Sequence, residues 1–178
     1  MHKNIESILI SEDKLEKIVN SLAKQIEKDY NDKEFIMLGL LKGSIAFMAD
    51  LMKHINLDFR IDFIVASSYG SGTESSGKVK ITKDTQFDVR GKNILIVEDV
   101  VDSGNTLNFV CNYLMTRGAA DVKVVTLCDK PSRRKVPFEP DYVGQVIPDE
   151  FIVGYGLDYN ELYRNLPYIG VLKRSVYE

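Results

Sequence analysis

Short, uninterrupted runs of apolar residues alternate along this chain with longer segments in which apolar residues recur every three or four positions. The first pattern is typical of strands buried on both faces of a sheet, and the second is typical of amphipathic helices. The predicted strands cover residues 35–41, 59–66, 94–97, 122–128, 142–147 and 168–172, with a hairpin return at 79–82, and the predicted helices cover 11–29, 46–55 and about 107–118. Strands that alternate with helices predict an α/β fold, in which a parallel sheet is flanked by helices.

The alternation of strands and helices ends in the last part of the chain, because residues 142–172 contain no long helical pattern. A length of 178 residues is enough for a single hydrophobic core. We therefore expect one domain over residues 1–178, with a core at about 35–140 and a small C-terminal hood built from about 141–178 together with the N-terminal residues. Within the strand at 59–66, Arg60 and Asp62 are expected on the wetter side.

One stretch, residues 93–106, organises the rest of the chain. A buried strand runs into Glu98 and Asp99, then into a turn of small and polar residues, and then into a helix: the turn is Asp102, Ser103, Gly104, Asn105 and Thr106. Free N–H groups at a helix N-terminus favour an anion, and a glycine lets the backbone approach it closely. The pattern therefore predicts a site for one phosphate monoester. The spacings of a Walker loop and of a dinucleotide fingerprint are both absent, which excludes those two phosphate-binding motifs.

The carboxylates of Glu98 and Asp99 would repel a phosphate in that turn unless something lies between them. Sugar hydroxyl groups could do so, and so could Mg²⁺, which prefers oxygen ligands near phosphates. These residues therefore indicate a sugar phosphate as the ligand. The alternative is that Asp99 or Asp102 only caps the next helix and that Glu98 is a solvated strand end, but the whole pattern favours a binding site.

Composition narrows the function classes. Apolar residues make up 44% of the chain and charged residues 28%, and the net charge of −3 gives no indication of binding to nucleic acid or to an anionic membrane. We expect neither a membrane span nor a signal segment. Cys111 and Cys128 lie in apolar patterns, which favours buried free thiols in a reducing, cytoplasmic compartment over a disulfide or a metal pair.

Residues 97–106 resemble the phosphoribosyl-pyrophosphate signature of type I phosphoribosyltransferases. Other segments, from about residue 35 to the end, resemble the hypoxanthine(-guanine) phosphoribosyltransferase subfamily: Leu41-Lys42-Gly43, Ser68-Tyr69, Lys130, 140–144, 147–149 and 151–161. The resemblance implies purine salvage by Mg²⁺-dependent transfer of 5-phosphoribosyl from phosphoribosyl pyrophosphate to N9 of hypoxanthine or guanine, giving IMP or GMP and pyrophosphate. It also implies a homodimer or homotetramer, and no nucleic-acid or membrane partner.

The resemblance assigns roles to single residues on the sugar-phosphate side. Glu98 and Asp99 would bind ribose hydroxyls and, through water, Mg²⁺, which Asp158 would also ligate. Asp102 would hold a proton at purine N7 as the general base. The 5′-phosphate would be held by Ser103, Gly104, Asn105 and Thr106, of which Asn105 is lysine in some relatives.

It assigns others to pyrophosphate and to the base. Pyrophosphate would be contacted by Leu41, Lys42 and Gly43, where the peptide before the lysine is often cis, by Arg134 and Arg164, and by Ser68 and Tyr69 of a lid continuing through 71–77. Lys130 would contact the 6-oxo group, Phe151 would stack on the purine, and the Ile152 backbone would meet its 2-position edge.

The chemistry of single residues, taken without the resemblance, indicates the identity of the substrate base only in part. An ammonium group is a hydrogen-bond donor only, so Lys130 favours an exocyclic carbonyl over the amine of adenine, and Phe151 could stack on a ring. A surface lysine and a core phenylalanine are the commoner fates of these residues. Xanthine, adenine and uracil transferases are alternative enzymes, and an RNA-binding regulator on the same fold is an alternative of another class. The choice between guanine and hypoxanthine is left open.

Overall fold

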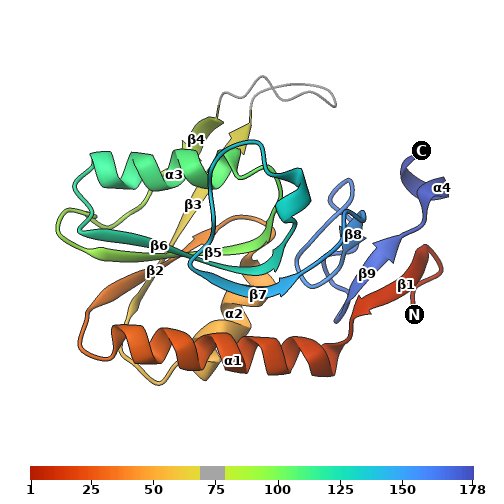
Figure 1. The fold of residues 1–178 in the computed structure, drawn as a ribbon, viewed down its shortest axis with the longest axis horizontal. Helices are drawn as coiled ribbons and strands as arrows, with labels where there is room; N and C mark the ends of the chain where they lie inside the picture. The colour runs from red at the N-terminus through yellow and green to blue at the C-terminus, as the bar shows by residue number, and fades with distance from the viewer. Residues whose placement is uncertain (69–78) are drawn as a thin grey trace.

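The computed structural model describes residues 1–68 and 79–178 (Figure 1). Tyr69 and the predicted lid at 71–77 lie outside the described residues, as does the side chain of Ser68. The large sheet has the strand order β4-β3-β2-β5-β6-β7, and its neighbours pair in parallel except for the antiparallel pair β3–β4. Its strands are β2 Phe35–Leu40, β3 Arg60–Ser68, β4 Val79–Lys83, β5 Asn93–Val101, β6 Asp121–Asp129 and β7 Tyr142–Val146. The predicted α/β class and the hairpin return at 79–82 are confirmed.

Helices cover both faces of this sheet, as Figure 1 shows. They are α1 Glu12–Tyr30, α2 Ile45–His54 and α3 Asn105–Thr116. Side chains of a strand alternate between faces, so Leu95 and Val97 of β5 join the core under α1 and α2, whereas Ile94 and Ile96 join the core under α3. This double burial explains why the strand sequence is apolar without interruption. Among the described residues, no helix is both long enough and apolar enough to span a membrane.

A second, three-stranded sheet lies beside the carboxyl ends of the large-sheet strands (Figure 1). It consists of antiparallel strands in the order β1 Ile5–Ile10, β9 Ile169–Leu172 and β8 Ile152–Val153, followed by the short helix α4 Arg174–Tyr177. We call these four elements and the loop 154–168 the hood. The N-terminal strand β1 pairs with β9 in this sheet, so N-terminal residues form part of the hood. The boundary at 141 was placed too early, because β7 pairs in parallel with β6 and belongs to the large sheet.

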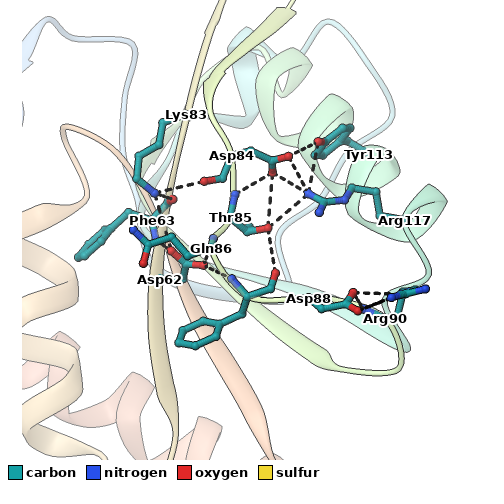
Figure 2. A network of polar contacts seen from close by, with 11 residues as sticks. Asp62, Phe63, Lys83, Asp84, Thr85, Gln86, Asp88, Arg90, Tyr113 and Arg117 are labelled. Carbon is teal, nitrogen blue, oxygen red and sulfur yellow. Dashed lines mark hydrogen bonds and ion pairs between the residues drawn. The ribbon is translucent and has the colours of Figure 1, made fainter.

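The expectation that Asp62 faces a wetter side is wrong, since only 5% of this residue is exposed. Its carboxylate accepts hydrogen bonds from the backbone N–H groups of Phe63, Gln86 and Phe87, at 2.7, 2.7 and 3.2 Å, and lies 3.8 Å from the Lys83 ammonium (Figure 2). The chain that follows β4 folds back over β3 and encloses this side chain. Hydrophobic patterning did not predict the burial, because Lys83, Gln86 and Phe87, which enclose the carboxylate, are distant in the sequence.

Candidate functional site

The central strand β5 extends farther than its apolar run. It continues through Val101 because β6 accompanies it, with Glu98 opposite Thr126 and Val101 opposite Asp129. Glu98 and Asp99 therefore lie inside the strand rather than after it, and as consecutive strand residues they face opposite sides of the sheet. Glu98 faces the turn before α3, and Asp99 faces the loop before α2. The predicted pair of carboxylates thus touches both loops at the carboxyl edge of the sheet.

The turn before α3 has the geometry of an anion site. Gly104 precedes α3 with φ of +78°, a left-handed conformation that glycine adopts without strain, and a Cβ there would lie 3.0 Å from Cδ of Arg134. The N–H of Asn105 donates to Oγ of Ser103 at 3.3 Å. A pocket of about 100 Å³ opens above the turn, lined by Glu98, Val100, Val101, Asp102, Ser103, Gly104, Thr106 and Leu107. The structure thus brings the predicted phosphate residues together, with Asn105 as the first residue of the helix.

Arg134 holds this turn through hydrogen bonds to its backbone. Its Nη1 donates to the backbone carbonyls of Val101 and Asp102, at 3.2 and 2.6 Å, and its Nη2 pairs with the carboxylate of Asp129. The side chain is only 14% exposed. All of its described contacts lie on the side of the phosphate turn, so the predicted contact of Arg134 with pyrophosphate near Lys42 stays a prediction, and bracing the turn is the role its contacts give it.

The loop before α2 lies between β5 and the hood. Its Leu41–Lys42 peptide is cis, in agreement with the family resemblance. A Cβ on Gly43 would stand 1.7 Å from Oδ2 of Asp99, and a Cβ on Gly156 would stand 2.1 Å from the Gly43 carbonyl oxygen. Both glycines are therefore needed for the close contact of strand, loop and hood, which places Lys42 beside the hood loop.

Charged side chains of the hood loop gather around Lys42. Arg164 donates from Nη1 to the carbonyl of Gly156 at 2.8 Å, and its Nη2 lies 2.9 Å from Oδ1 of Asp158 and 3.1 Å from Oε2 of Glu161. The other carboxylate oxygen of Glu161 lies 3.1 Å from Nζ of Lys42. The structure thus brings Lys42, Asp158 and Arg164 together through Glu161 and Arg164. Sequence reasoning gave no role to Glu161, because nothing local indicates that it bridges two cations.

Burial changes the acid strength of the two β5 carboxylates. It raises the pKa of Glu98 well above its ordinary value, and the neighbouring charge of Asp99 adds to this effect. It also raises the pKa of Asp99 to about 6, although the backbone N–H of Val100 and the guanidinium of Arg164 lower it. A cation bound beside these groups would favour their ionised forms.

The predicted magnesium ligands are Glu98, Asp99 and Asp158. In the described part of the chain, no three His, Cys, Asp or Glu side chains converge into a group that could hold a metal by itself. Mg²⁺ seldom needs such a cage, because it keeps several waters and binds one or two carboxylates together with substrate phosphates. The carboxylate oxygens of these residues are the kind of donor that this partial role requires.

The two residues predicted to contact the base, Lys130 and Phe151, do not have the exposure that is commoner for a lysine and a phenylalanine. Lys130 is buried, with 5% exposed, and its Nζ donates to the Glu150 carbonyl at 2.9 Å. The same Nζ lies 3.4 Å from Oδ1 of Asp102, a buried oxygen without a hydrogen-bond partner in the described residues. Phe151, by contrast, is 38% exposed, while Ile152 beside it is buried in β8. A buried cation thus lies beside Asp102 of the phosphate turn, and the carbonyl that it contacts belongs to the residue directly before the exposed aromatic ring.

Comparison with known proteins agrees with this geometry. A family model described as the phosphoribosyl transferase domain matches residues 7–160. The chain is 51% identical over 178 residues to a hypoxanthine-guanine phosphoribosyltransferase of Bacillus subtilis, covering 100% of this chain and 99% of that protein. It is 50% identical over 177 residues to the bifunctional protein TilS/HprT of Listeria innocua, covering 99% of this chain but only 27% of that longer protein.

A solved structure extends the likeness to three dimensions. The crystal structure of a hypoxanthine phosphoribosyltransferase from Staphylococcus aureus matches with a TM-score of 0.96 at 48% identity, covering 100% of this chain and 97% of the other. The family match, the sequence relatives and the shared fold span nearly the whole chain. The matched region therefore includes the two loops and the hood described above. This protein therefore belongs to the phosphoribosyl transferase domain family.

Proposed function

We propose that this protein is a purine-salvage enzyme that transfers 5-phosphoribosyl from phosphoribosyl pyrophosphate to N9 of hypoxanthine or guanine, producing IMP or GMP and pyrophosphate. The observation that carries the proposal is the buried ammonium of Lys130 beside the phosphate turn, 3.4 Å from Asp102. The relatives named for this reaction, in Bacillus subtilis and elsewhere, support it.

Lys130 selects the base. One of its three N–H groups is directed to the Glu150 carbonyl, which fixes the ammonium and leaves two donors. These donors suit the 6-oxo group of hypoxanthine or guanine, which is a hydrogen-bond acceptor. The 6-amino group of adenine is itself a donor and could not accept a hydrogen bond from Lys130. The exposed ring of Phe151 offers a stacking surface for the purine, and the adjacent Ile152 backbone is proposed to meet the 2-position edge.

Asp102 handles the proton at N7. Its buried Oδ1 lacks a hydrogen-bond partner among the described residues, and it faces the Lys130 ammonium. An acceptor held ready beside the base can take hydrogen from N7 as N9 attacks the sugar. The N–H groups at the start of α3, with Ser103, Gly104, Asn105 and Thr106, would hold the 5′-phosphate and so fix the sugar relative to the base.

Lys42, Arg164 and the Leu41–Gly43 backbone would bind the departing pyrophosphate, with Ser68 and Tyr69 closing over it and Arg134 keeping the turn in place. Glu98 and Asp99 would orient the ribose hydroxyls from the two sides of β5. Mg²⁺, held by Glu98 and Asp99 through water and by Asp158, would supply neutralisation of the leaving charge. The oxygen donors of the site suit that ion, and the pyrophosphate would complete its shell.

We further propose that residues 1–178 act as a single cytoplasmic domain that assembles into a homodimer or homotetramer and binds neither nucleic acid nor membrane. The net charge of −3 supports the last point. Exposed Ile45 and Met52 on α2 support self-association. Light scattering coupled to size-exclusion chromatography measures the assembly, and a monomeric mass at enzyme working concentration would reject it.

A substrate panel tests the function. Nucleotide formation is measured with phosphoribosyl pyrophosphate, with and without Mg²⁺, for hypoxanthine, guanine, xanthine, adenine and uracil. We expect Mg²⁺-dependent products from hypoxanthine, guanine or both, and none from adenine or uracil. Reaction with adenine or uracil alone would reject the base assignment. No reaction with any base, together with tight RNA binding, would favour a regulator on the same fold.

A further inference from the structure

The ring of Phe151 rests on an aromatic side chain from a distant part of the chain. Tyr177 lies in α4, and its ring is stacked on that of Phe151 with centroids 4.7 Å apart and planes inclined by 21°. The ring of Tyr159 meets Phe151 edge-on, with centroids 5.5 Å apart and an angle of 86°. Two hood tyrosines thus cover one face and one edge of the predicted stacking residue.

Tyr177 is anchored in the hood. It is half-buried and packs against the small hydrophobic cluster of Ile5, Val153 and Leu172, each of them at most 1% exposed. Phe151 remains 38% exposed, although Tyr177 covers one of its two faces. The face turned away from Tyr177 is therefore the one that is open to a purine.

The backbone fixes the same assembly. The N–H of Leu172 donates to the Phe151 carbonyl at 2.8 Å, which ties the strand before α4 to the stacking residue. On the other side of Phe151, the Glu150 carbonyl accepts a hydrogen bond from Lys130 at 2.9 Å. The ammonium that reads the base and the ring that stacks on it are thus joined through one peptide, and only the orientation of the ring is left for side-chain packing to set.

We infer that Tyr177 is a positioning residue for the purine: by stacking on the rear face of Phe151, it holds the free face of that ring in the plane that the base must occupy beside Lys130. This inference rests on the proposed function. Holding the ring in place before binding removes the cost of ordering it when the base arrives. The effect belongs to the ring of Tyr177, since its hydroxyl makes no hydrogen bond with any residue that the structure describes.

Steady-state kinetics of Tyr177→Leu and Tyr177→Phe test the inference. In Tyr177→Leu the KM for hypoxanthine should rise roughly 3- to 10-fold, the range expected from loss of one aromatic pair, while the KM for phosphoribosyl pyrophosphate stays unchanged. Tyr177→Phe should match the wild type. Phe109→Leu is the matched control, because Phe109 is a similarly exposed ring (37%) stacked on Tyr113 on α3, and it should shift neither KM.

Two further measurements separate positioning from folding. Thermal unfolding shows whether each variant is folded. Calorimetric titration with ribose 5-phosphate should give the wild-type affinity, because the ion pairs and long-range hydrogen bonds of the phosphate turn within the described residues are with residues 130–135 and not with the hood. Tyr177→Met serves in place of Tyr177→Leu should the latter not fold, since it keeps more of the side-chain volume.

The outcomes distinguish the inference from the proposed function. A wild type that uses hypoxanthine and a Tyr177→Leu variant with the same KM would overturn the inference and leave the function standing. A lower KM in that variant would also overturn it, because Tyr177 would then be a competitor of the purine for Phe151. Equal rises of both KM values would assign Tyr177 a general structural role. A wild type that uses no purine would reject both proposals.

Discussion

Nζ of Lys130 lies 3.4 Å from Oδ1 of Asp102, although the two residues come from different loops at the carboxyl edge of the sheet. The contact depends on the pairing of their strands, because the N–H of Lys130 donates to the carbonyl of Val101 at 3.0 Å. Parallel strands β5 and β6 thus set the distance between the group proposed to contact the base and the group proposed to hold its proton.

Replacing Asp102 with asparagine should reduce kcat by roughly 10²- to 10⁴-fold, the usual contribution of a positioned acid or base. The affinity for ribose 5-phosphate should change little, because the amides before α3 are intact. Rapid-quench assays and calorimetry measure the two quantities. Asp88→Asn, at an exposed residue paired with Arg90, is the control and should retain full activity. Equal losses in turnover and in sugar-phosphate affinity would reject the base assignment.

Replacing Lys130 with methionine should weaken hypoxanthine binding more than phosphoribosyl-pyrophosphate binding. A charge-assisted hydrogen bond contributes about 1.5–3 kcal/mol, which corresponds to a KM for hypoxanthine roughly 10- to 100-fold higher. The preference for hypoxanthine over adenine should also fall, since the donor that disfavours the amine is gone. Competitive assays with both bases measure this ratio. An unchanged ratio would show that another group reads the 6-position.

Gly104→Ala should destabilise the protein and weaken binding of the 5′-phosphate. A left-handed conformation costs a residue with a Cβ about 1–2 kcal/mol, and here the Cβ would also crowd Arg134 at 3.0 Å. Gly91→Ala is a matched control, because Gly91 has a similar φ of +68° with nothing within 4 Å of its would-be Cβ. Urea unfolding should show a loss in both variants, larger in Gly104→Ala, and only that variant should lose affinity for ribose 5-phosphate. Equal effects would reject a special role of Gly104.

Asp99→Asn should stabilise the ligand-free protein at neutral pH while it impairs activity. Burial raises the pKa of Asp99 from 3.8 to about 6, so between these values the folded protein holds a proton that the unfolded chain has released. Folding then binds protons, and the contribution of Asp99 to stability falls as pH rises through that window. The stability gain of Asp99→Asn over the wild type should therefore grow from pH 4 to pH 7 in urea unfolding. A gain that does not vary with pH would contradict the raised pKa.

The main elements could be predicted because their causes are local. An uninterrupted run such as 94–97 can be buried on both faces only in a covered sheet, and Gly104 in the 102–106 turn indicates a tight turn, which the structure shows as a positive φ. The predicted end of this strand at Val97 was too early, because local patterning ends the strand where the polar residues Glu98 and Asp99 begin. In the structure β5 continues to Val101 because it pairs with β6 as far as Asp129. The burial of Asp62 could not be predicted either, since Gln86 and Phe87, whose backbone N–H groups bind its carboxylate, lie more than twenty residues away in the sequence.

The amino-acid pattern alone predicted the class of fold and a turn suited to a phosphate, because periodicity and motif chemistry act over a few neighbouring positions, whereas most candidate site residues were assigned by the resemblance to a family. Only the tertiary structure decided that Glu98 and Asp99 face opposite loops, that Arg134 braces the turn, and that Tyr177 supports Phe151. These relationships depend on strand pairing and on side chains that meet from distant segments. Such contacts form only when the whole chain packs, so no local stretch of sequence records them.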